Sequence, residues 1–187
     1  MSPHSVPLKT WLKARRAVNA LHLELMALNY DLDGALASGQ YGLAWWTQQN
    51  MLTTAVELSL SEAGTEVPPS ADPLDRAFTS LDLLRRAGPE RAATAWELLL
   101  RTQPQDSEVR EESARTLAFI EHGLGLPRAL TRQGAVREWA ESTALLRAVA
   151  KHVGVARSDT WYLSRETGPD TDWYSDVLAV LADERLK

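Results

Sequence analysis

Cysteine is absent from the 187 residues of this chain. The absence excludes disulfide bonds, thiolate zinc sites, iron–sulfur clusters and cysteine nucleophiles. Long apolar runs are also missing, because no segment reaches the roughly 18 apolar residues of a membrane-spanning helix. The first residues, Met1 to Pro7, lack the charged segment and apolar run of a signal peptide. We therefore expect a cytoplasmic protein with no membrane partner.

Positive charge is scarce. The chain has 20 Lys and Arg residues against 25 Asp and Glu residues, which gives a formal net charge of -5. Proteins that bind nucleic acid need a concentrated basic face for phosphate contacts. Nucleic acid is therefore not an expected partner. The length and the 44% hydrophobic composition suit one globular domain over residues 1–187.

Signals for β-strands are missing too. There is no run of alternating β-branched residues and no Asn-Gly or Asp-Gly turn, whereas Ala, Leu, Arg and Glu dominate. We predict an all-α protein, an up-and-down helical bundle of about six to seven helices. A solenoid of repeated helix pairs would contain as many helices, but no fixed period recurs, which favours the bundle.

The amino-terminal hairpin, residues 7–64, is the clearest feature that the sequence does contain. Two long helices are expected to meet at Ser38-Gly39-Gln40, and Gly39 and Gly64 are expected to end them. Heptad spacing of apolar or small residues in the first helix predicts one buried face. Those residues are Trp11, Ala14, Val18, Leu21, Leu25, Leu28, Leu32 and Ala35. We expect the tryptophans of the hairpin to lie in its dry seam.

Proline, glycine and capping residues predict where the later helices begin and end. After the proline-rich linker 65–71, Asp72 is expected to cap a helix that begins at Pro73, and Gly88-Pro89 is expected to begin the next. The predicted elements are a helix to about Ala87, one from Pro89 to Pro104, one capped by Asp106 or Ser107 and ending at Gly123, one over about 131–153, an irregular segment over 154–170 and a terminal helix over 171–185.

Aromatic and amide side chains crowd the second helix of the hairpin. Apolar walls with a few polar groups are typical of a pocket for a polar small molecule. Glu57, three turns beyond Trp46 on a similar bearing, is a candidate base if burial raises its pKa. The alternative, which we favour, is ordinary packing of the tryptophans with the amides and Glu57 facing water. The candidate ligand-binding residues here are Tyr41, Trp45, Trp46 and Gln49.

A doubled motif lies near the end of the chain, as Asp159-Thr160-Trp161-Tyr162 and Thr171-Asp172-Trp173-Tyr174. An acidic side chain beside an aromatic ring suits a cationic or sugar-like ligand. Trp161, Asp172 and Trp173 are therefore ligand-binding candidates. The alternative is that the acidic residues cap helices while the aromatic rings pin the last helix to the bundle, and it is the favoured one.

Histidine supplies one more catalytic candidate, His22. The spacing from Arg16 to His22 resembles the Arg-x(4 to 6)-His pattern of HEPN-class ribonucleases, but it recurs from Arg115 to His122 and from Arg147 to His152. Because His22 adjoins the heptad stripe, a core-edge histidine is the favoured interpretation. No Glu-x-x-His or His-Glu-x-x-His motif occurs, so we expect neither a metal nor another cofactor.

Residues 35–64, the proline-rich stretch and Asp72 resemble one family in their helix lengths and small residues. The pattern is similar to the helical substrate-binding domain of kanamycin- and lincosamide-type nucleotidyltransferases, itself similar to the HEPN bundles. The resemblance covers about residues 10–125 and implies a bundle that presents a pocket or pairs with a nucleotidyltransferase subunit. Asp31-Leu32-Asp33 has no Gly-Ser upstream, so the nucleotidyl-transfer motif of that family is missing.

Two classes of function follow from these features. The first is a helical module that binds a polar small molecule, as the substrate-binding half of a nucleotidyltransferase-like system. The alternative is a stand-alone tailoring enzyme of a bacterial biosynthetic pathway, in which a buried carboxylate such as Glu57 supports proton transfer or cyclisation. A pure interaction protein is a third class and predicts no enclosed pocket. A second copy of the chain, in a homo-oligomer, is a further expected partner.

Overall fold

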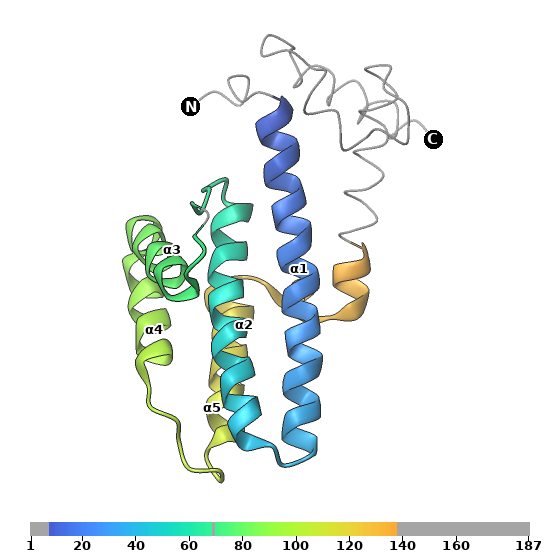
Figure 1. The fold of residues 1–187 in the computed structure, drawn as a ribbon, viewed down its shortest axis with the longest axis vertical. Coiled ribbons are helices and arrows are strands. Elements are labelled where there is room, and N and C mark those ends of the chain that lie inside the picture. Colours follow the sequence, from blue (N-terminus) through green and yellow to red (C-terminus); the bar gives the residue numbers. More distant parts are fainter. Residues whose placement is uncertain (1–7, 69, 138–187) are drawn as a thin grey trace. The chain divides into compact units, whose positions relative to one another are not determined.

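The computed structural model describes the backbone of residues 8–68 and 70–137, and the side chains from Ala17 onward within those ranges (Figure 1). The chain divides into two compact units, one of residues 20–135 and one of residues 1–19 with 136–187. The first unit contains the elements discussed below. The irregular segment 154–170 and the terminal helix 171–185 lie outside the described residues, so the expectation of a single domain stays a prediction.

Helices make up most of the described part of the chain, and no strand occurs among these residues. The predicted all-α helical bundle is confirmed. None of the helices that these residues form is long and apolar enough to cross a bilayer. The elements are α1 (Leu8–Ala37), α2 (Tyr41–Glu62), α3 (Pro73–Ala87), α4 (Pro89–Leu100), α5 (Val109–Ala118), the π-helical turn η2 (Phe119–Gly123) and the 3-10 turn η3 (Pro127–Leu130).

Two glycines close the helices of the hairpin, as the sequence predicts. Gly39 and Gly64 have φ angles of 71° and 77°, in the left-handed region that glycine enters without a steric penalty. After α1, the Gln40 amide donates to the carbonyl of Ala35 at 2.9 Å. After α2, the Thr65 amide donates to the carbonyl of Leu60 at 2.8 Å. The same cap therefore ends both helices.

The start of α3 also follows the prediction. The Asp72 carboxylate accepts a hydrogen bond from the Leu74 amide at 2.9 Å, and Pro73 occupies the first helical position. Pro89 has the same position in α4. Because α3 and α4 are joined only through Gly88, they pack against each other, and the rings of Phe78 and Trp96 lie 5.4 Å apart between their centroids.

Two boundaries differ from the prediction. The helix α4 ends at Leu100 rather than at Pro104: its C-cap, Arg101, is extended with a ψ angle of 137°, and the ring of Pro104 disfavours a helical conformation at Gln103. The prediction that Asp106 or Ser107 caps the next helix is wrong. A turn over residues 106–108 makes Glu108 the N-cap of α5, and no side chain caps that helix.

The core surrounds α2, which contacts α3, α4 and α5. One polar pair lies within this core: the Ser113 hydroxyl of α5 donates to Oε1 of Gln48 at 2.8 Å. On α1 the predicted face is buried at Leu21, Leu25, Leu32 and Ala35. The largest fully buried side chains of the hairpin are Leu25, Leu32, Met51, Leu52, Val56, Leu58, Leu60 and Gln48.

The expectation that the hairpin tryptophans fill the dry seam is wrong for Trp46. Its exposed fraction is 62%, and the neighbouring Trp45 is half-buried. Leucine and methionine side chains occupy the buried positions of the hairpin instead. The exposed ring of Trp46 can therefore line a surface cleft.

Candidate functional site

A cleft of about 460 Å³ lies where α1, α2 and the beginning of α3 meet. Its floor is a stripe of α2 that carries Trp46, Asn50, Thr53 and Glu57, spaced at four, three and four residues. This spacing places all four side chains on one side of a helix. The remaining lining residues are Leu21, Glu24 and Leu28 of α1, Thr54 of α2, and Ser70, Ala71, Pro73, Arg76 and Ala77 around the start of α3.

An ion pair between α2 and α3 lies in the cleft. Nη2 of Arg76 donates to Oε2 of Glu57 at 2.5 Å. The Glu57 side chain is only 9% exposed, whereas that of Arg76 is 46% exposed. The carboxylate therefore lies at the bottom of the cleft and the guanidinium reaches solvent.

Burial raises the pKa of Glu57 above its usual value of 4.5. The hydrogen bond and positive charge of Arg76 act in the opposite direction, and the negative charge of Glu24 adds a smaller upward contribution. Removing a carboxylate from water disfavours its charged form, and here this effect exceeds the benefit from the guanidinium. The carboxyl group of Glu57 therefore loses its proton at a higher pH than a carboxyl group in water does.

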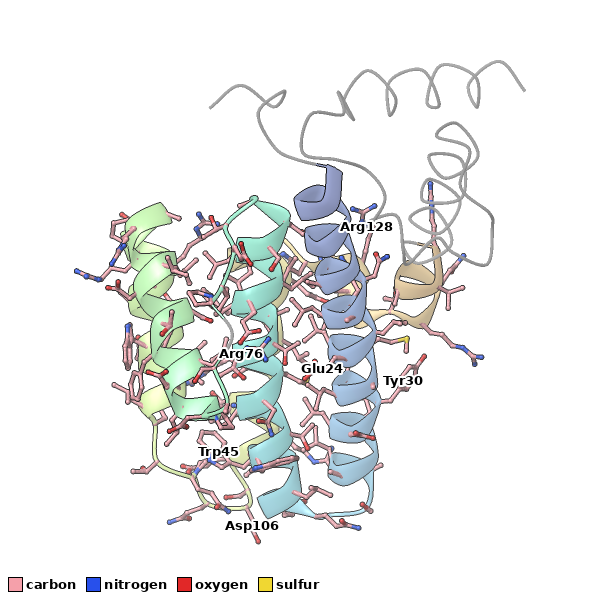
Figure 2. The ribbon with its side chains drawn as sticks, turned by 45° about the horizontal axis from the view of Figure 1, so that its top comes forward. Glu24, Tyr30, Trp45, Arg76, Asp106 and Arg128 are labelled. Atoms are coloured by element: carbon pink, nitrogen blue, oxygen red, sulfur yellow. The ribbon has the colours of Figure 1, made fainter. Side chains whose placement is uncertain are left out.

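Glu24 approaches the same face of α2 from α1. The Thr54 hydroxyl donates to Oε1 of Glu24 at 3.4 Å, a long hydrogen bond between neighbouring helices. In Figure 2 the side chains of Glu24 and Arg76 extend toward this face from opposite sides. The cleft therefore holds two carboxylates and one guanidinium.

The candidates predicted on α2 divide between two sides of the helix. Trp46 and Glu57 line the cleft, whereas Tyr41, Trp45 and Gln49 are not among its lining residues. Nε2 of Gln49 instead donates to the carbonyl of Leu98 on α4 at 3.5 Å. The structure thus brings only part of the predicted aromatic and amide group together.

His22 is a buried side chain at the edge of the core and does not line the cleft. Its Nε2 lies 2.9 Å from Oε1 of Glu62, which joins α1 to α2. Its Nδ1 is buried and has no partner among the described residues. His122, the only other histidine with a described side chain, is 82% exposed.

Trp161, Asp172 and Trp173 lie outside the described residues. Asp31 and Asp33 are exposed on α1. In the part of the chain that the structure describes, no three or more histidine, aspartate or glutamate side chains are grouped so as to hold a metal ion.

Two charged residues of the cleft, Glu24 and Arg76, were not among the predicted candidates. Glu24 had a usable signal, because it lies between Leu21 and Leu28 of the heptad face. Arg76 had none, since its pairing with Glu57 depends on how α3 folds back on α2. Comparisons of the chain with family models, with curated proteins and with solved structures find no match.

Proposed function

We propose that this protein is a helical module that binds a polar small molecule in the cleft between α1, α2 and α3. One observation carries the proposal: the cleft combines a partly buried ion pair, Glu57 with Arg76, and a largely exposed ring, Trp46. Ligand sites commonly combine apolar walls with a few charged groups that orient the ligand. An ion pair whose guanidinium reaches solvent adds little stability, so its charged groups are available to orient a ligand.

The family resemblance of residues 10–125 extends this proposal to a partner. On that basis the module would supply the substrate-binding half of a nucleotidyltransferase-like system, and a separate subunit would supply the catalytic motif that this sequence lacks. A gene for a bare nucleotidyltransferase domain beside this one would support the extension.

A second candidate function rests on the raised pKa of Glu57. A carboxyl group that keeps its proton to higher pH suits general acid or base chemistry. In this version the protein is a tailoring enzyme and the ligand is its substrate. Chemical change of a bound ligand that stops in Glu57→Gln would favour the enzyme, and recovery of the ligand unchanged would favour the binding module.

Filling the cleft tests the binding proposal. Ala77 of α3 is half-buried and lines the cleft, so Ala77→Phe places a ring in the ligand space. Ala93→Phe adds the same ring to an exposed position of α4 as a matched control. We expect fragments from a set of neutral, cationic and anionic small molecules to bind the wild type and the control, and to bind Ala77→Phe at least about tenfold more weakly.

Circular dichroism melts show whether both variants fold. Trp46→Ala provides a second test that adds no bulk, and we expect it to weaken binding because it removes the exposed ring. If no fragment binds the wild type, or if Ala77→Phe and Trp46→Ala bind fragments as tightly as the control does, the proposal is wrong.

A further inference from the structure

The hydroxyl hydrogens of the cleft are used within the protein. The Thr53 hydroxyl donates to the carbonyl of Asn50 at 2.9 Å, and the Thr54 hydroxyl donates to Glu24. Ser70 Oγ donates to Oδ2 of Asp75 at 3.0 Å. A hydroxyl group has one hydrogen to donate and two lone pairs to accept with. These side chains therefore offer acceptors, rather than donors, to a ligand.

Asn50 uses one of its two N–H donors in a similar way. Its Nδ2 donates to the carbonyl of Trp46 at 3.1 Å. Its side-chain oxygen is left as an acceptor on the stripe of α2 that forms the cleft floor. The free N–H donors lie on Asn50, which keeps one, and on Arg76, which donates one of its five to Glu57. The hydroxyl oxygens and the Asn50 oxygen are acceptors for a ligand that brings its own N–H donors.

The charges of the cleft favour a cationic ligand. Glu57 and Arg76 compensate each other at 2.5 Å, which leaves the carboxylate of Glu24. Among the described residues Glu24 forms no ion pair, and its hydrogen bond to Thr54 is long. An uncompensated carboxylate beside acceptor groups attracts a cation.

The other end of the cleft is apolar. Trp46 is eight residues before Thr54, so its ring lies about 12 Å along α2 from the level of Glu24. Leu28 of α1 also lines the cleft. A ligand that reaches both ends needs a charged group joined to an elongated apolar body.

We propose that the cleft binds an organic cation in which one ammonium or amidinium group is joined to an apolar or aromatic body. The charged group lies against Glu24 and donates to the neighbouring acceptors, and the body extends along α2 to Trp46. This inference rests on the proposed function and specifies the ligand class for the same cleft.

Three compounds that differ only in the end group test the inference. Calorimetric titration of the full chain at pH 7 compares 4-phenylbutylamine, 4-phenylbutan-1-ol and 5-phenylpentanoate. A hydrogen bond to a charged group is stronger than a neutral one, so we expect the amine to bind roughly tenfold or more tighter than the alcohol. The acid should bind more weakly than either.

Glu24→Gln should reduce the amine affinity roughly tenfold and leave the alcohol affinity unchanged. Asp33→Asn is the matched control, because it removes one negative charge from an exposed position of α1 about 180° around the helix from Glu24. We expect this control to bind the amine as the wild type does. Amide spectra of each variant show whether it keeps the native fold.

The outcomes separate this inference from the proposed function. If the alcohol or the acid binds the cleft as tightly as the amine, the cation inference is wrong and the small-molecule site remains. Equal loss of amine affinity in Glu24→Gln and Asp33→Asn also overturns it, since the attraction would then come from overall charge. If neither these compounds nor the fragment set binds, the proposed function itself fails.

Discussion

The angular position of each residue around the axis of α2 decides whether its side chain reaches the cleft. At about 100° per residue, Trp46 and Glu57 differ by about 20° although eleven residues separate them. Trp45 differs from Trp46 by about 100°, and it is not among the lining residues. The sequence therefore predicts that Trp46 and Glu57 share a face, and helix geometry alone separates adjacent tryptophans.

Burial of Glu57 makes the stability of the protein depend on pH. Its pKa is raised in the folded state, so unfolding releases a proton at pH values between the ordinary 4.5 and the folded value. The free energy of unfolding should fall as pH rises through this window. Glu57→Gln lacks the titrating group, so its stability relative to the wild type should increase over the same window.

Urea denaturation at intervals from pH 4 to pH 8 measures both curves. Glu90→Gln, at an exposed position of α4, is the control and should run parallel to the wild type. A Glu57→Gln curve that also runs parallel to the wild type would show that the native environment does not favour the protonated carboxyl group.

At the scale of elements, local sequence signals fix most helix boundaries. Gly39 and Gly64 act through their own backbone geometry, and the Asp72-Pro73 pair acts through a local side-chain cap and the fixed φ of proline. The helix ends that they define could therefore be predicted from the sequence. The start of α5 could not, because Asp106 and Ser107 are good capping residues that are placed in a turn before the helix. Capping propensity alone does not decide which of several neighbouring residues begins a helix.

Gly34, inside α1, and Gly39, in its cap, form a matched pair that tests whether local backbone geometry ends the helix. A Cβ atom at Gly34 or at Gly39 would meet nothing within 4 Å, so neither substitution by alanine creates a clash. Gly34 is inside the helix, and Gly34→Ala should raise the free energy of unfolding by about 0.5–1 kcal/mol. Gly39 has a φ of 71°, and Gly39→Ala should lower it by about 1–2 kcal/mol.

Chemical denaturation of the two variants measures both effects. Opposite signs are the expected result, because the surroundings are equally open and only the backbone conformation differs. Destabilisation of the same size in both variants would mean that the left-handed cap does not control how the hairpin turns.

At the scale of the compact unit formed by residues 20–135, the cleft depends on contacts between segments that are distant in sequence. Arg76 meets Glu57 across 19 positions, and Thr54 meets Glu24 across 30. Periodicity within one helix predicts a shared face, but it does not predict which side of α2 the neighbouring helices cover. The all-α class and one wall of the site could therefore be predicted from the sequence, and the other two walls could not.

Mapping of bound fragments onto the backbone tests the central claim most directly. Amide resonances of the full chain are recorded while each binding fragment is titrated, so that the perturbed residues locate the site. We predict that the largest changes fall within 21–28, 46–57 and 70–77, the three segments that line the cleft. Changes concentrated in α4 and α5, or no change in these three segments at saturation, would contradict the account.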